Sequence, residues 1–142
     1  MRHLALLLAL ALAGCAGGDN AIAEPAWGTA TCAHCRAVIT EQRHAAQMRS
    51  ADGAVLAFDD PACLFRALAA SAPPRAVRFH GPGAGEWIEG SAAWFARVPG
   101  QPTPRGDGWA AYPSFAAAQD AVAQAGGGEI LPFDQVRQRI AP

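Results

Sequence analysis

The sequence contains no lysine, so arginine alone supplies its 11 basic side chains, against 12 acidic ones. The formal net charge at pH 7 is −1. A protein that binds nucleic acid through a basic groove, or a membrane through a polybasic patch, needs a clear excess of positive charge. The composition therefore excludes nucleic acid and a bare membrane surface as expected partners.

Long apolar runs are also absent, except for Leu4–Ala13 near the start, which is too short to cross a bilayer as a permanent helix. Arg2 and His3 give this segment a positive start, and small residues follow it, which is typical of an export signal. The stretch "LAGC", ending at Cys15, resembles the bacterial lipobox. The resemblance implies cleavage before Cys15 and a lipid on its sulfur; an ordinary signal peptide cut near Ala23 is the alternative.

We therefore expect residues 1–14 to be a lipoprotein signal peptide and residues 15–31 to be a lipidated tether, since this segment is small, glycine-containing and without periodicity. The residue directly after Cys15 is Ala16 and not aspartate, which resembles the sorting signal of outer-membrane lipoproteins. The predicted location is the periplasmic side of a bacterial membrane, with the lipid as the membrane anchor. The mature chain would have 142 minus 14, or 128, residues, which suits one ordinary domain.

Cysteine is scarce, and its number is informative. Of the 4 cysteines, removal of Cys15 as the lipid site leaves Cys32, Cys35 and Cys63. An odd number in an exported protein means that at least one thiol is unpaired, or that the cysteines serve chemistry.

Hydrophobic periodicity and turn residues predict an α+β fold. Two segments, "DGAVLAFDDPACLFRALAAS" and "DGWAAYPSFAAAQDAVAQAG", share a turn, a short strand that ends in an aromatic residue, and a helix. This weak repeat predicts two related ββαβ units in one compact body, residues 32–81 and 82–142. The expected helices are 59–71 and 113–127, 93–98 is a strand or a helix, and the expected strands are 36–40, 44–50, 54–58, 75–80, 106–112 and 129–133.

Cys32 and Cys35 form a CxxC motif. The flanking elements and residues that most functions of this motif require are missing. No buried strand precedes it and no helix follows it, as a thioredoxin-like dithiol requires. Arg36 stands where a c-type haem needs histidine. Structural zinc usually needs a second CxxC or an HxxxH motif, although Cys63 and His80 could complete a set of four. A plain structural disulfide also remains open.

Copper(I) fits the motif better, because it is a soft ion that takes two or three ligands and prefers thiolate and thioether sulfur. His34, His44 and Met48 lie close to the pair in sequence. Each also has a simpler explanation, since Met48 suits a strand core and the histidines suit the surface. Cys63, on the apolar face of the expected helix, is more readily a small buried hydrophobe than a ligand.

Taken together, the lipobox, the short tether and the CxxC that opens the fold resemble the NosL family of copper-binding lipoproteins. The matching segments cover nearly all of residues 29–137: "AAQMRSADGAVLAFDDPACLFRAL", "EWIEGSAAWFARV", "TPRGDGWAAYPSFAAAQDA" and "GGGEILPFDQV". The resemblance implies a fold of two ββαβ units, akin to organomercury lyase. It also implies a non-enzymatic carrier of one copper(I), accessory to nitrous oxide reductase, which passes the metal to a copper-receiving enzyme or an ABC-type maturation complex.

On this resemblance Cys32 and Cys35 match the family's cysteines, and we expect Met48 and His34 to complete the metal site. Arg36-Ala37 stands where the family usually has Gly-Met, and Arg105 follows Thr-Pro where the family usually has methionine. A thiol–disulfide oxidoreductase that uses the same pair, and a lipoprotein with a structural disulfide, are the alternatives. In air we expect a Cys32–Cys35 disulfide with Cys63 free, and copper(I) binding only after reduction.

Overall fold

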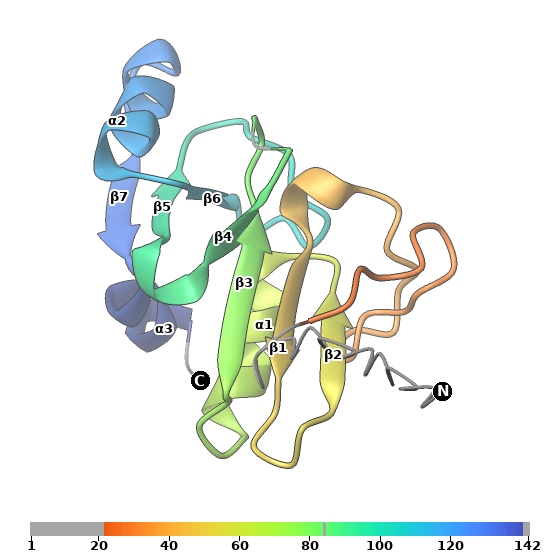
Figure 1. The fold of residues 1–142 in the computed structure, drawn as a ribbon. Coiled ribbons are helices and arrows are strands. Elements are labelled where there is room, and N and C mark those ends of the chain that lie inside the picture. Colours follow the sequence, from red (N-terminus) through yellow and green to blue (C-terminus); the bar gives the residue numbers. More distant parts are fainter. Residues whose placement is uncertain (1–21, 84, 141–142) are drawn as a thin grey trace, which may run out of the picture.

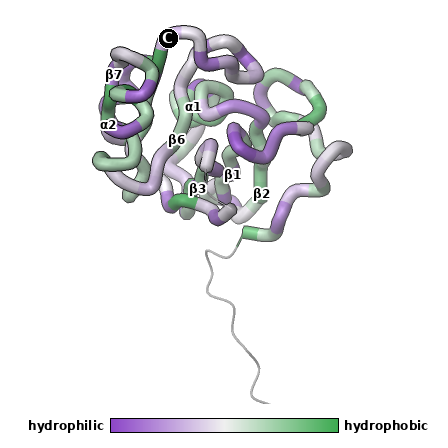
Figure 2. The backbone as a smooth tube through the Cα atoms, turned by 90° about the horizontal axis from the view of Figure 1, so that it is seen from above, coloured by the Kyte–Doolittle hydropathy of each residue, from purple (hydrophilic) through white to green (hydrophobic). Residues whose placement is uncertain are grey.

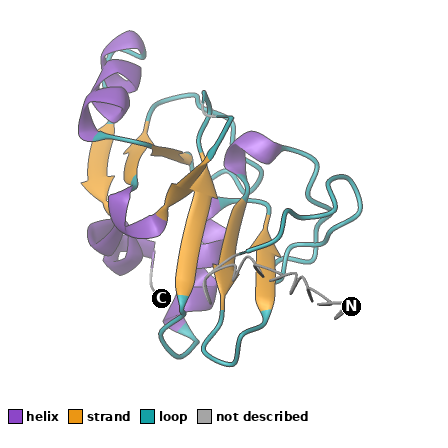
Figure 3. Cartoon of the chain, in the orientation of Figure 1, coloured by secondary structure: helices purple, strands orange, loops and turns teal. Residues whose placement is uncertain are grey.

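The computed structural model describes residues 22–83 and 85–140. The predicted signal peptide and the predicted lipid site, Cys15, lie outside these residues. The described chain has two antiparallel sheets with three α-helices, which confirms the predicted α+β class (Figures 1 and 3). None of the described helices combines the length and the apolar character that a membrane crossing requires.

The first sheet has four strands in the order β2-β1-β3-β4, all antiparallel to their neighbours. The strands are β1 (Ala46–Arg49), β2 (Val55–Phe58), β3 (Ala76–His80) and β4 (Trp87–Glu89). The predicted Asp-Gly turn joins β1 to β2, and Gly53 takes a positive φ of 95° there, a conformation that glycine adopts without strain. Helix α1 (Pro61–Ala69) connects β2 to β3.

The second sheet repeats this arrangement with three strands in the order β6-β5-β7. The elements are β5 (Trp94–Arg97), β6 (Trp109–Tyr112), α2 (Phe115–Gln124) and β7 (Glu129–Pro132). In each unit the first strand lies between the second and the third, and the helix follows the second strand. This shared order agrees with the repeat predicted from the two Asp-Gly segments.

Helix α1 connects the two units through an aromatic cluster. The ring of Phe65, on α1, lies 5.6 Å from that of Phe79 and 5.2 Å from those of Phe95 and Phe133, measured between centroids. These rings come from β3, β5 and α3 (Phe133–Ile140), so one residue of α1 contacts both sheets and the last helix. Seen from above, α1 is central, with α2 and β7 on one side of it and β2 on the other (Figure 2).

The segment before β1 differs from the expectation. Residues 36–40 form no strand; a single bridge pairs Thr31 with Val38. Part of the predicted tether also contacts the sheet, since the carbonyl oxygen of Ala23 accepts hydrogen bonds from Gln47 (3.0 Å) and Arg78 (3.3 Å). Residues 22–31 therefore lie against the fold, and a short 3₁₀ helix, Gln42–His44, leads into β1.

Candidate metal site

Three cysteines and one aspartate come together at the end of β2. The ligand atoms of Cys32, Cys35, Asp59 and Cys63 all lie within 4.8 Å of one another, and we call this group the thiol cluster. Its members come from the loop before β1, the link between β2 and α1, and the first turn of α1. All three cysteines are free thiols.

The CxxC loop is held by backbone hydrogen bonds that turn both cysteines to the same side. The amide of Cys32 donates to the carbonyl oxygen of Ala37 (2.8 Å), and the amide of Arg36 donates to that of Cys32 (3.0 Å). Arg36 closes the turn with a positive φ of 69°, a conformation uncommon for residues other than glycine. The amide of Ala33 donates to the carbonyl oxygen of Ala57 (2.9 Å), which fixes the loop against β2.

The opposite side of the cluster is the start of α1. Asp60 is the N-cap of this helix, and its carboxylate accepts a hydrogen bond from the amide of Ala62 (2.8 Å). Pro61 follows at the first helical position, where its fixed φ suits the helix. Asp59 and Cys63 therefore lie on either side of a firmly capped helix start.

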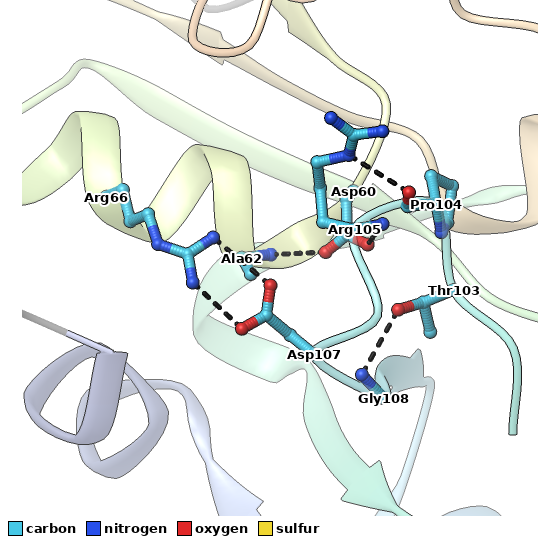
Figure 4. Close-up of polar contacts among 8 residues, drawn as sticks. All are labelled: Asp60, Ala62, Arg66, Thr103, Pro104, Arg105, Asp107 and Gly108. Carbon is cyan, nitrogen blue, oxygen red and sulfur yellow. Dashed lines mark hydrogen bonds and ion pairs between the residues drawn. The ribbon is translucent and has the colours of Figure 1, made fainter. Parts of the chain in front are cut away.

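A loop of the second unit closes over this helix start (Figure 4). The amide of Arg105 donates to the carboxylate of Asp60 (2.9 Å), and the Arg105 guanidinium lies 3.8 Å from the carboxylate of Asp59. Asp107, further along the same loop, accepts two hydrogen bonds from Arg66 of α1 (2.8 and 3.1 Å). Both units therefore contribute to the surroundings of the thiol cluster.

The three thiols differ in exposure and in partners. Cys32 and Cys63 are 0% exposed, whereas Cys35 is partly exposed. The Cys35 thiol donates to the carboxylate of Asp59, at 3.3 and 3.5 Å from its two oxygens. Asp59 is itself only 4% exposed. Since Cys32 and Cys63 are buried, Cys35 has the most exposed thiol of the cluster.

The three thiols also differ in acidity. The pKa of Cys32 is lowered from 9.0 to about 6, chiefly because the Cys63 thiol donates a hydrogen bond to it, and the amides of Cys35 and Asp59 act in the same direction. The pKa of Cys63 is raised because it donates that bond and is buried. Burial is also the main cause that raises the pKa of Cys35. These effects favour the thiolate form of Cys32 over those of Cys35 and Cys63.

The structure places two predicted ligands outside this group. His34 is exposed at the middle of the CxxC loop and is not among the four clustered residues. Met48 is 3% exposed and belongs to the hydrophobic core. It pairs with Leu56, three residues before Asp59, which corresponds to roughly 10 Å along a strand.

Two other histidines from the sequence analysis are not part of the cluster either. His44, expected at the surface, is only 2% exposed; burial lowers its pKa, and its Nδ1 has no hydrogen-bond partner among the described residues. His80, also expected at the surface, is 6% exposed and packs against the rings of Trp27 and Trp87.

Sequence reasoning missed Asp59 as a member of the site and treated Cys63 as a hydrophobe. One signal was present: the stretch "DDPAC" combines an N-cap, a proline at the helix start and a cysteine in the first turn. Backbone N–H groups at a helix start favour a thiolate. What no local pattern contains is the approach of the CxxC loop, 24 residues before Asp59 in the chain.

Comparisons with known proteins show which known fold this chain resembles. No family model matches the sequence, and no curated protein matches it significantly. Among solved structures, the copper chaperone NosL from Shewanella denitrificans superposes with a TM-score of 0.69 at 20% sequence identity. The match covers 80% of this chain and 94% of that protein. The chain therefore has a NosL-like fold, as the sequence resemblance predicted.

Proposed function

We propose that this protein is a carrier of copper(I), which binds one ion through the thiols of Cys32, Cys35 and Cys63 and passes it to an acceptor protein outside the cytoplasm. The observation that supports this most directly is the thiol cluster itself. Three sulfurs from separate segments of the chain converge in one place. A fold that needed these cysteines only for packing would have no reason to bring their sulfurs together.

The donor set suits a soft metal ion. Thiolate sulfur is the ligand that copper(I) prefers, and a set of two or three such ligands satisfies it. With a metal–sulfur bond of about 2.3 Å, the value for zinc thiolates, two sulfurs bound to one ion lie at most roughly 4.6 Å apart. The ligand atoms lie within 4.8 Å of one another, so small side-chain shifts would bring the sulfurs to an ion.

The protonation states favour loading through Cys32. Its lowered pKa favours the thiolate form, and the ion displaces the remaining protons from the thiols as it binds. Asp59 accepts the Cys35 hydrogen bond, and its charge is balanced by Arg105. Arg105 stands where the NosL family usually has methionine, and a guanidinium is not a copper ligand, so we assign it to charge balance.

The fold supports the same function. The similar structure is named as a copper chaperone. By this likeness, and by the sequence resemblance, we propose that the copper serves assembly of a copper enzyme such as nitrous oxide reductase, through that enzyme or an ABC-type maturation complex. Acylated Cys15 would hold the carrier at the periplasmic side of the membrane, and the carrier would catalyse no reaction of its own.

A thiol–disulfide oxidoreductase is the second candidate, because a thiolate at Cys32 beside further thiols is also the starting point for disulfide exchange. The two candidates differ in a simple assay. We expect the chain from residue 16 onward, purified under reductant without oxygen, to retain one copper(I) per molecule after desalting and to leave insulin unreduced. Insulin reduction without retained copper would favour the oxidoreductase.

Each thiol can be tested by substitution. Serine at Cys32, Cys35 or Cys63 removes one soft donor while keeping the shape, so each variant should bind copper(I) more weakly by at least tenfold. Competition with a chromogenic copper(I) chelator measures the change. Val38→Ser serves as the control, because Val38 is in the same loop, is 47% exposed and is not in the cluster.

A further inference from the structure

The three sulfurs of the thiol cluster are not equally open to a partner protein. Cys32 and Cys63 are 0% exposed and belong to the hydrophobic core, with Ile39 and Phe58 among its other members. Cys35 is partly exposed. Metal transfer between proteins by ligand exchange requires that a ligand of the acceptor bind the ion before the donor has released it. An acceptor must therefore reach the ion from the side of Cys35.

The contacts of the sulfurs divide them in the same way. Cys32 and Cys63 are both fully buried, and their sulfurs lie within 4.8 Å of each other. Cys35 instead donates to Asp59, whose carboxylate lies 3.8 Å from the guanidinium of Arg105, a side chain that is 40% exposed. Cys35 thus has a polar partner that can hold its thiol when no metal is bound to it.

We propose that Cys35 is the exchange ligand of the site: an acceptor's thiolate replaces Cys35 first, while Cys32 and Cys63 keep the ion until the last step. This inference rests on the proposed copper function and deepens it by assigning the order in which the ligands leave. It makes the acceptor a protein with a soft, protruding sulfur ligand, because only such a ligand can enter beside Cys35.

The exchange step balances without a further reactant. The bond between copper and the Cys35 sulfur breaks, and a bond between copper and the acceptor's sulfur forms. Copper remains in the +1 state, so no electron is transferred. The proton that the acceptor thiol loses is balanced by the proton that Cys35 gains, and the resulting Cys35 thiol makes the hydrogen bond to Asp59 that the structure contains.

The test compares serine variants of the three cysteines in the chain from residue 16 onward, which includes every described residue. Each variant is loaded with one equivalent of copper(I) without oxygen. Copper retained after desalting is measured first. The rate of transfer to excess dithiothreitol, a small thiol acceptor, is measured next, and Cys63→Ala accompanies Cys63→Ser in case the buried hydroxyl disturbs folding. Val38→Ser is the matched control.

We expect Cys35→Ser to retain its copper, because two buried thiolates remain, but to transfer it to the acceptor at least tenfold faster than the wild type, because the ligand that leaves first is already absent. Variants at Cys32 and Cys63 should lose their copper on desalting. Transfer from Cys35→Ser at the wild-type rate would overturn the inference, as would retention by the Cys63 variants with loss from Cys35→Ser. A wild type that holds no copper would overturn the proposed function itself.

Discussion

Replacing Cys63 by alanine tests the electrostatic coupling within the thiol cluster most sharply. The main reason for the low pKa of Cys32 is the hydrogen bond from the Cys63 thiol. Alanine removes that donor, whereas the burial that opposes ionisation of Cys32 stays. The test is best made with the chain from residue 16 onward that also carries Cys35→Ser. The titration then measures the pKa of Cys32 without a contribution from Cys15 or Cys35.

The expected shift is large. Cys32 titrates at about 6 instead of 9.0, a difference of 3 pKa units. At about 1.36 kcal/mol per unit, this corresponds to about 4 kcal/mol in favour of the thiolate. If Cys63→Ala returns the pKa to 9.0 or higher, the thiolate fraction at pH 7 falls from about 90% to about 1%.

The ultraviolet absorbance of the thiolate as a function of pH measures this directly, because it needs no reagent to reach the buried sulfur of Cys32. The midpoint should rise clearly above about 6 when Cys63 is replaced, because the main cause that lowers it is removed and burial stays. Leu68→Ala controls for lost packing, since Leu68 is buried on the same helix and is no part of the cluster. An unchanged midpoint in Cys63→Ala would refute the reasoning.

Three other substitutions test the remaining parts of the account. Cys15→Ala should abolish incorporation of labelled palmitate into the full chain in a bacterial host; equal labelling would rule out the lipid anchor. Met48→Leu should leave copper stoichiometry unchanged and lower the free energy of unfolding by less than about 1.5 kcal/mol, because it conserves core volume; loss of copper would make Met48 a ligand. Asp60→Ala removes the α1 cap and leaves the amide of Arg105 without its partner, so denaturant unfolding should show a loss of about 2–4 kcal/mol. A loss below about 0.5 kcal/mol would show that Asp60 does not support the helix start.

Several elements could be predicted from the sequence because their signals are local. The Asp-Gly turn between two short segments predicted the β1–β2 hairpin, and the expected helix 59–71 contains α1. The elements that were missed have weak local signals. Strand β4 has only three residues, and α3 follows β7 directly at Phe133 without a capping residue. The position of α3 depends on the packing of Phe133 against Phe65, which are far apart in the sequence.

The candidate site was only half predictable for the same reason. The spacing of Cys32 and Cys35 identifies a pair of sulfurs, but nothing in that spacing points to Cys63 or Asp59. These residues join the pair because the amide of Ala33 docks the loop on β2. Sequence proximity favoured Met48 and His34 instead. Neither is among the four clustered residues, and whether either binds the ion stays a prediction.

X-ray absorption at the copper edge of the loaded chain tests the central claim most directly, because it reports the atoms bound to the ion. The proposed site predicts a first shell of three sulfurs without nitrogen in the wild type. It predicts a loss of one sulfur in Cys35→Ser, which keeps its copper, and no change in Met48→Leu. A shell that contains histidine nitrogen, or one that is unchanged in Cys35→Ser, would contradict the three-thiol site.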